Sequence, residues 1–340
     1  MRLRTSRPHS PGYTGVRHGR GFSFQDTEGR TVTETEVAER ERLRALAIPP
    51  AWGDVWICPW ANGHVQAVGT DGAGRRQYVY HEHFRELQEE SKHDHVLHVA
   101  TRLPQLRGAV AEDLAGRGLT RQRVLACLAR LLELGFFRVG GAVYRRDHQA
   151  YGLTTLLREH AECSRGEVCF PYPGKSAQQQ TRALVNPASY AVVRALLSRR
   201  DSRPQLFVYW RARDWHDVDA DEVNAYLRDR TGTDITAKDF RTWHATVLAA
   251  VALAVSEDMA DASPTRRRRA ETRAVHEVSC YLGNTPAVCR ASYINPRIFE
   301  LFEEGTTIRP ALVTLGEGAE YGHPATQGSV EKAVLRLLSG

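Results

Sequence analysis

Two glycine-containing turn signals in the first quarter of the chain constrain its fold more than any other feature. Asn62-Gly63 and Asp71-Gly72 separate three short segments of strand-like composition, DVWICPW, HVQAVGTD and RRQYVYH. Asn-Gly and Asp-Gly tolerate the positive φ angles of tight hairpin turns, so two of them in succession favour antiparallel pairing. Residues 1–90 are therefore predicted to form a small β-rich domain built around an antiparallel sheet.

The residues before these strands carry a basic segment and one helix signal. No acidic residue precedes Asp26, whereas five arginines do, and residues 1–20 are expected to form a mobile basic arm. Thr33 and Glu36 match the capping box that opens a helix. That helix must end by Pro49, because proline lacks the backbone N–H that a helix interior needs.

Beyond about residue 90 the spacing of apolar residues becomes helical. Helix starts are indicated by Thr and Asp, which cap N-termini, and helix ends by glycine. These signals predict a helix from Thr120 to Gly135, one from Asp219 and Glu222 to Gly232, one from Thr236 into the apolar run 245–255, and one ending at Gly283. The second predicted domain, residues 91–340, is therefore mainly α-helical.

One segment interrupts this helical pattern. EVCFPYP and the residues after Lys175 both have strand composition, and Gly174-Lys175-Ser176 lies between them. A β-hairpin with a lysine at its tip is therefore predicted inside the helical domain. The tripeptide is also similar to the end of a phosphate-binding loop, but Cys169 stands where that loop needs a glycine, which argues against ATP use.

Charge and cysteine usage narrow the class of protein. A net charge of +6 favours a polyanionic partner such as nucleic acid. The six cysteines are scattered and contain no CxxC pair, which suits reduced intracellular thiols better than disulfides or a zinc site. The longest apolar run, 245–255, is much shorter than the ~20 residues of a membrane-spanning helix, and no apolar signal segment begins the chain. We therefore expect a cytoplasmic protein without a membrane partner.

Two further clusters leave alternatives open. Histidines are dense between His81 and His98, but their spacing matches no standard zinc or metalloprotease motif, and several would alternate between the faces of a strand. Surface histidines beside DNA or solvent are favoured over a metal site, and no metal is predicted.

The arginine run 266–269 is either a solvated basic segment or a set of phosphate contacts.

Cleavage of a DNA strand without a metal ion has its own residue requirements. Charge that builds on the non-bridging phosphate oxygens needs cationic or hydrogen-bonding partners, and arginine offers a permanent charge with paired donors. The leaving alkoxide needs a proton, which a lysine can supply. Tyrosine, with an ordinary pKa of ~10, needs the same cationic surroundings to act as a nucleophile. Composition alone does not locate such a set in an arginine-rich chain.

Five segments resemble the type IB DNA topoisomerases of the bacterial and poxvirus-like branch. LGNTPAVCRASYINP (282–296) is similar to the segment that carries the nucleophilic tyrosine. KDFRTWHAT (238–246) and FFRVGGAVY (136–144) are similar to the segments of the two catalytic arginines, and PGKS is similar to the hairpin of the catalytic lysine. GRRQYVY (74–80) resembles the strand that such enzymes lay on the DNA major groove. The matches follow the family order from about residue 35 to residue 300.

The resemblance implies a role for each matched side chain. Arg138 and Arg241 would bind the scissile phosphate, and Lys175 would protonate the leaving 5′-oxygen. Tyr293 would form the 3′-phosphotyrosyl bond. Asn284 stands where many relatives have histidine. Its amide can donate a hydrogen bond to a phosphoryl oxygen but cannot carry a proton, which excludes an acid–base role there.

The resemblance also implies supporting and DNA-binding residues. Lys238 is expected to support the site, and Gln77, Tyr78, Tyr80 and Tyr144 are expected to contact DNA. For Gln77, Tyr78 and Tyr80, an ordinary structural role in the strand is an equal alternative to DNA contact. The implied fold is a β-rich N-terminal clamping domain with a mainly α-helical catalytic domain that carries a β-hairpin and is related to the tyrosine recombinase catalytic fold.

The implied function is relaxation of supercoiled duplex DNA by a monomer, in a bacterial-type, nucleoid-associated setting and without ATP, metal or another cofactor. A tyrosine recombinase is the nearest alternative, but recombinases usually carry histidine where this chain has Lys238, and their N-terminal domain is usually helical. A non-catalytic DNA-binding module is the other alternative. The presence of every expected catalytic residue type argues against it.

Overall fold

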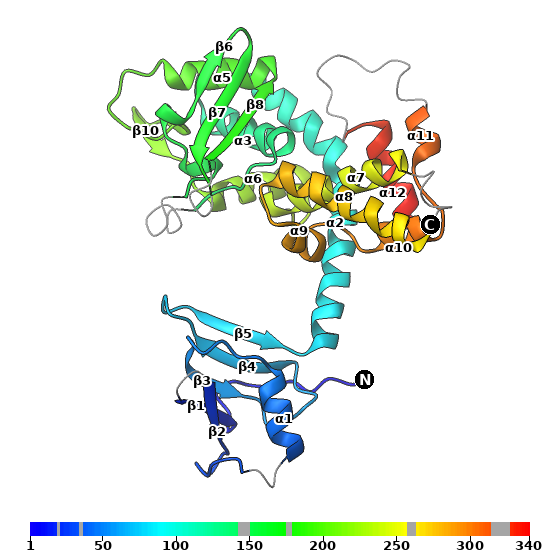
Figure 1. Ribbon diagram of the computed structural model, residues 1–340. Helices are drawn as coiled ribbons and strands as arrows, with labels where there is room; N and C mark the ends of the chain where they lie inside the picture. The colour runs from blue at the N-terminus through cyan, green and yellow to red at the C-terminus, as the bar shows by residue number, and fades with distance from the viewer. Residues whose placement is uncertain (19–20, 34–36, 142–149, 175–178, 257–262, 314–326) are drawn as a thin grey trace. The chain divides into compact units, whose positions relative to one another are not determined.

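The structure of the protein is a computed structural model with two compact parts, both drawn in Figure 1. Contacts divide the chain into a first unit, Met1–Lys92, and a second unit, His93–Gly340. The residues that the structure describes are 1–18, 21–33, 37–141, 150–174, 179–256, 263–313 and 327–340.

The first unit is built on one antiparallel sheet with the strand order β2-β1-β3-β4-β5. Leu43 of the helix α1 (Val37–Ala45) is buried with Val55, Ile57 and Ala67 of the sheet, so this helix covers one sheet face. The pairing of β4 with β3 and with β5 confirms the two predicted hairpins. The strands are β1 (Tyr13–His18), β2 (Gly21–Gln25), β3 (Gly53–Ile57), β4 (Val65–Thr70) and β5 (Arg76–Tyr80).

The N-terminal segment differs from the expected mobile arm. β1 pairs with β2 on one side and with β3 on the other. Ahead of it, the backbone N–H of Arg4 donates to the carbonyl of Asn62 at 2.9 Å, and its guanidinium carbon lies 3.5 Å from the ring centroid of Trp60. The prediction was wrong for these residues because charged side chains can stay in solvent while their backbone pairs in a sheet.

A helix of 33 residues, α2 (Glu82–Leu114), follows β5 and contains the boundary between the two units. His83 and His98 both lie within it, so the expectation that this region alternates as a strand was wrong. The buried apolar residues between Val96 and Val110 recur at intervals of three or four, which is the helical period. A short stretch of sequence around the polar, histidine-rich start of the helix does not show this period, because the buried apolar residues begin only at Val96.

The second unit is mainly helical, and two small antiparallel sheets complete it. One has the order β6-β7-β8 and the other pairs β9 with β10. The strands are β6 (Glu162–Ser164), β7 (Glu167–Pro173), β8 (Gln179–Val185), β9 (Val208–Arg211) and β10 (Asp214–Asp217). The helices after α2 are α3 (Arg121–Gly135), α5 (Pro187–Leu197), α6 (Ala220–Thr231), α7 (Ala237–Val255), α8 (Pro264–Leu282), α9 (Pro286–Ser292), α10 (Arg297–Glu303), α11 (Arg309–Val313) and α12 (Ser329–Ser339). A β-rich first unit and a mostly helical second unit with β-hairpins confirm the predicted fold class at this level.

Several predicted helix boundaries are confirmed by their capping contacts. The carboxylate of Asp219 accepts the backbone N–H of Glu222 at 2.7 Å, which opens α6. Gly232 and Gly283 end α6 and α8 in the left-handed conformation, with φ of 65° and 61°. These boundaries depend on residues a few positions apart, so the sequence reveals them.

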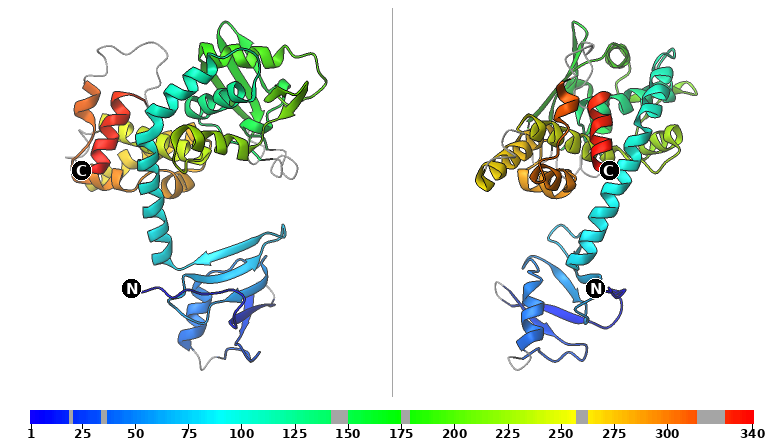
Figure 2. Two further views of the ribbon diagram at one scale, coloured as in Figure 1. Left: turned by 180° about the vertical axis from the view of Figure 1, so that it is seen from behind. Right: turned by 90° about the vertical axis from the view of Figure 1, so that its right-hand side faces the viewer.

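α7 is the central helix of the second unit (Figure 2). It packs against α3, α6, α8, α10, α11 and α12. Trp243 in its middle is fully buried and donates its indole N–H to Glu331 of α12 at 2.7 Å. No helix in the described ranges is both long and apolar enough to cross a membrane. Because these helices pack around α7, its buried side chains have fixed positions.

Candidate active site

Arg241 on α7 is the most deeply buried of the described residues predicted to act on DNA, with 4% of its surface exposed. Its Nη2 donates to the carbonyl of Leu282, the last residue of α8, at 2.8 Å, and its Nη1 donates to the carbonyl of Phe136. Phe136 is the C-cap of α3, with φ of 55°, one residue after the predicted stop at Gly135. Carbonyls at helix C-termini lack helical partners and carry partial negative charge, so they hold the guanidinium in one orientation.

Arg138 and Asn284 meet at the end of α8. Arg138 donates through Nη2 to the side-chain oxygen of Asn284 and to the carbonyl of Gly283 at 3.4 Å. The N–H of Asn284 bonds back to the carbonyl of Ser279 at 3.1 Å, which is the contact expected after a left-handed glycine cap. Because the arginine occupies the amide oxygen, the amide nitrogen is the free end. That nitrogen is buried and has no acceptor among the described residues.

Two glycines place the segment that carries Arg138. The carbonyl of Arg138 accepts the N–H of Leu153 at 2.8 Å, so the segment runs against the chain after Gly152. A Cβ on Gly152 would lie 2.4 Å from the Cα of Gly140, and Gly140 itself has a φ of +91°. Only glycine permits this close approach and this backbone angle together. The VGG sequence after Arg138 therefore allows the close backbone packing that positions the arginine.

Tyr293 is the half-buried C-cap residue of α9 and lies beside Arg241. The guanidinium carbon of Arg241 is 5.4 Å from the centroid of the tyrosine ring. Thr246, also on α7, accepts the N–H of Asn295 at 3.0 Å, and its hydroxyl lies 3.4 Å from the carbonyl of Tyr293. One helix therefore positions both the arginine and the backbone around the tyrosine.

The surroundings of the site lower the pKa values of both Tyr293 and Arg241. Burial opposes ionisation of the Tyr293 phenol, but the charge and hydrogen bond of Arg241 lower its pKa below the usual 10, with smaller contributions from Arg138 and Lys238. Burial and the neighbouring Arg138 lower the pKa of Arg241 to about 10. Lys238 itself is exposed in the first turn of α7. A bound phosphate would relieve the repulsion between the guanidinium groups.

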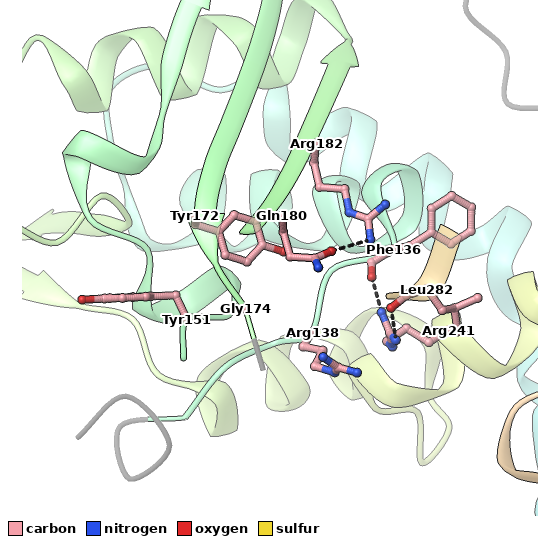
Figure 3. Close-up of a pocket in the computed structure, with 9 residues that line it drawn as sticks. All are labelled: Phe136, Arg138, Tyr151, Tyr172, Gly174, Gln180, Arg182, Arg241 and Leu282. Atoms are coloured by element: carbon pink, nitrogen blue, oxygen red, sulfur yellow. Dashed lines mark hydrogen bonds between the residues drawn. The ribbon is translucent and has the colours of Figure 1, made fainter. Parts of the chain in front are cut away.

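The guanidinium groups face one pocket of the second unit (Figure 3). Three of the lining residues are arginines and none is acidic, so the pocket suits an anion with several oxygens. Lys175 and Tyr144 lie outside the described residues. Gly174, which directly precedes Lys175, is part of the pocket wall. The lining residues are Phe136, Arg138, Tyr151, Tyr172, Gly174, Gln180, Arg182, Arg241 and Leu282.

Several residues of this pocket were not predicted from the sequence, among them Gln180 and Arg182 on β8. The burial of β8 alternates, with its even-numbered residues turned inward. Two polar side chains at inward positions of a predicted hairpin are the signal that could have found them. Thr246 was also missed, because its contacts with residues 293–295 are visible only in the folded chain.

The predicted DNA-binding strand presents two tyrosines to solvent in the first unit. Tyr78 and Tyr80 are 45% and 40% exposed, and their rings stack with centroids 5.9 Å apart. Gln77 alternates to the other face of β5, where its side-chain amide donates to Asp71 at 2.9 Å. The structure therefore groups the two tyrosines and separates the glutamine from them.

The histidines of α2 have individual surroundings. His95 Nε2 lies 3.5 Å from a carboxylate oxygen of Asp239, the residue that completes the capping box of α7. His83 lies 3.3 Å from Glu86 one turn further along α2. Outside the gaps of the structure, no group of three or more His, Cys, Asp or Glu residues is placed to hold a metal ion.

We expect the phenol of Tyr293 to ionise below the usual tyrosine range in the DNA-free protein, because Arg241 stabilises the phenolate. The measurement is the difference between ultraviolet titrations of the wild type and Tyr293→Phe, whose midpoint should fall below 10. The midpoint should rise in an Arg241→Gln background. The same difference for Tyr172→Phe serves as the control and should give a higher midpoint, because burial raises the pKa of that phenol. A Tyr293 midpoint at or above 10 would contradict this electrostatic account.

Comparisons with known proteins identify the family. Residues 81–304 match the family described as eukaryotic DNA topoisomerase I, catalytic core, and residues 21–71 match the bacterial DNA topoisomerase IB N-terminal domain. The chain is 28% identical over 284 residues to the DNA topoisomerase 1B of Acanthamoeba polyphaga mimivirus, covering 79% of this chain and 82% of the relative. It is 24% identical over 195 residues to the DNA topoisomerase 1B of vaccinia virus (strain Copenhagen), covering 56% of this chain and 61% of the relative. The monkeypox virus DNA topoisomerase I is 23% identical over 194 residues with the same coverage. Because the catalytic-core match alone spans more than half of the chain, the protein belongs to the type IB DNA topoisomerase family.

Proposed function

We propose that this topoisomerase relaxes supercoiled duplex DNA by cutting one strand through a 3′-phosphotyrosyl bond to Tyr293 and then resealing it. The observation that carries the proposal is the position of Tyr293 beside Arg241, which lines a pocket with two further arginines and no acidic lining residue. Such a pocket favours both the phenolate and the charge that builds on a phosphate under attack.

The chemistry balances without an added reactant. The phenol of Tyr293 first loses its proton to solvent; the phenolate oxygen then attacks the phosphorus, the bond from phosphorus to the 5′-oxygen breaks, and Lys175 gives that oxygen its proton. After the free end has rotated, the 5′-hydroxyl attacks the phosphotyrosine, Lys175 takes the proton back, and the phenolate leaves. The phosphotyrosyl ester retains the energy of the original phosphodiester, so ATP is not required.

The surrounding side chains receive distinct roles in this proposal. Arg138 and Arg241 neutralise the non-bridging oxygens, and Asn284 donates its amide N–H to one of them. The contact of Arg138 with the amide oxygen supports this role, because it leaves the amide nitrogen as the free donor. Lys238 adds a smaller, screened charge from the exposed edge of the site.

The first unit supplies DNA contacts in the same proposal. Tyr78 and Tyr80 present an exposed, stacked aromatic pair suited to a base-lined groove, while Gln77 would have to leave Asp71 to reach DNA. Tyr144 is proposed as a further contact. We propose that the enzyme acts as a monomer on nucleoid DNA in the cytoplasm, and that its catalytic fold is related to that of tyrosine recombinases.

Purified protein should relax supercoiled plasmid in excess EDTA and without ATP, because arginines and a lysine supply the charge stabilisation that metal ions supply in many nucleases. The assay is a time course of topoisomer distributions on an agarose gel, with Tyr293→Phe as the inactive control. Magnesium can change the turnover rate by altering product release. Activity that vanishes in EDTA and returns with a divalent ion would overturn the mechanism. Strand-exchange products between duplexes would indicate a recombinase, and binding without relaxation a DNA-binding module.

A further inference from the structure

Arg182 is a pocket residue without an assigned role. It lies on β8, opposite Phe170 of β7. In the sequence, Lys175 stands between these two strands. Strand alternation turns Gln180 and Arg182 to the same inward face. Figure 3 shows the guanidinium of Arg182 directed into the pocket, on the side opposite Arg138 and Arg241. The hairpin therefore brings a third cation to the pocket.

Three hydrogen-bond donors, on β8, on α7 and just after the end of α8, are left without acceptors at this site. They are the Nε of Arg182, the Nε of Arg241 and the side-chain nitrogen of Asn284, and all three atoms are buried. An unmade hydrogen bond of a buried polar group costs ~1–3 kcal/mol, and more for a charged group. Catalytic sites are one place where natural folds keep such groups, because a bound ligand can satisfy them. A tetrahedral anion offers the several acceptors that these donors lack.

The contacts of Arg182 hold it in place without neutralising it. Its Nη2 donates to the side-chain oxygen of Gln180 at 3.3 Å, and a hydrogen bond links it to the hydroxyl of Tyr172. Gln180 in turn packs against Gly283, where an added Cβ would come within 2.9 Å of the glutamine oxygen. These partners are neutral groups, and no described residue lining the pocket is acidic. A half-buried arginine with neutral partners retains its charge for a ligand.

We propose that Arg182 is a further catalytic residue, a third guanidinium that donates its Nε–H to a non-bridging oxygen of the scissile phosphate. This inference rests on the proposed function, in which Arg138 and Arg241 bind the same phosphate. Charge on the non-bridging oxygens is greatest in the transition state, so a fixed third donor favours cleavage more than binding. Repulsion among three guanidiniums in the free enzyme is relieved when the phosphate enters.

The test is single-turnover cleavage of a duplex at saturating enzyme, with noncovalent affinity measured separately in a Tyr293→Phe background. Arg182→Ala should slow cleavage by about 10²-fold, the lower end of the range for losing one transition-state donor, and change the dissociation constant by less than about threefold. Arg182→Lys should recover part of the rate because it restores the charge without the fork. Arg194→Ala, which removes an exposed arginine of α5, is the matched charge control and should cleave normally.

A substrate with a methylphosphonate at the cleavage site makes the test specific to the scissile phosphate. A neutral methyl group there replaces one charged non-bridging oxygen, so a residue that neutralises this oxygen loses its importance. The rate ratio of wild type to Arg182→Ala should therefore shrink at least several-fold on one of the two methylphosphonate diastereomers. A purely structural defect would slow the variant equally on all substrates. Arg182→Gln, which keeps a polar side chain, repeats the measurement should the alanine variant fold poorly.

The outcomes separate this inference from the proposed function. Wild-type cleavage by Arg182→Ala, or an effect confined to affinity, would overturn the inference, provided that Arg241→Ala is defective. Equal losses on phosphate and on both methylphosphonate diastereomers would also overturn it. If Arg241→Ala cleaves like the wild type as well, the pocket does not bind the scissile phosphate and the proposed function itself fails.

Discussion

Tyr293→Phe should abolish covalent protein–DNA adducts and plasmid relaxation while leaving duplex affinity close to that of the wild type. The substitution removes one hydroxyl, and the half-buried ring can keep its place beside Arg241. Binding depends mainly on phosphate contacts, so both proteins should show the same steep, log-linear loss of affinity with salt. Adducts are measured by denaturing gel after mixing with labelled duplex, and affinity by titration at several salt concentrations.

Two tyrosines other than Tyr293, Tyr151 and Tyr172, line the pocket and provide matched comparisons for this substitution. Tyr293 itself lies beside the pocket residue Arg241. Tyr172 is buried, and burial raises the pKa of its phenol, which disfavours a nucleophilic role. Tyr172→Phe and Tyr151→Phe should therefore still form adducts. Adducts at the wild-type level in Tyr293→Phe would move the nucleophile elsewhere, and their loss in Tyr172→Phe alone would point to that residue.

The second large effect concerns Lys175 and separates proton donation from charge stabilisation. Lys175→Ala should slow cleavage of normal DNA by about 10²- to 10⁴-fold, the range for a general acid. Replacing the leaving 5′-oxygen by sulfur should restore most of the rate, because a thiol has a pKa of ~8.5 and its thiolate departs without a proton. The measurement is single-turnover cleavage of oxygen- and sulfur-bridged duplexes by the same enzyme preparations.

Asn284 is the internal comparison for the lysine. Its free amide nitrogen can donate to a phosphoryl oxygen but not protonate a leaving group. Asn284→Ala should therefore be slower on both substrates alike, by about 10²- to 10³-fold. Asn284→His should retain much of the activity, since an imidazole N–H can donate from a similar place. Sulfur rescue of the asparagine variant but not of the lysine variant would reverse the two roles, and rescue of neither would make Lys238 the next candidate acid.

Local sequence signals predicted the elements whose ends are decided within a few residues. Gly283 ends α8 because glycine adopts a positive φ without cost, and Asp219 opens α6 by capping a nearby N–H. Gly135 shows the limit of such rules. Its Cβ would lie 2.2 Å from the ring of Phe137, so the glycine makes room for that ring, while the left-handed residue is Phe136. At position 135 glycine is therefore needed to make room for a side chain and not to adopt a positive φ at the end of the helix.

Two predictions made from composition, for the basic N-terminal segment and for the histidine-rich segment, were wrong. The basic segment before residue 20 contains β1, which lies inside the sheet because its backbone pairs with β2 and β3. The histidine-rich segment belongs to α2, whose apolar period becomes regular only from Val96 onward. For β1 one of the two partner strands, β3, lies far away along the chain, and for α2 the regular apolar residues lie beyond a short window over the histidines.

For the site, the sequence by itself determined which residue types are present and, through the resemblance, which positions to examine. The tertiary structure decided how they are aimed. Carbonyls at the ends of α3 and α8 orient Arg241, Arg138 sets the direction of the Asn284 amide, and strand alternation brings Arg182 into the same pocket. The orientations of Arg138 and Arg241 depend on contacts with distant residues, more than a hundred positions apart for Arg138 with Asn284 and for Arg241 with Phe136. A local pattern cannot encode them, because a guanidinium acts through the direction of its N–H groups, and that direction is set by whichever distant acceptors the fold places beside it.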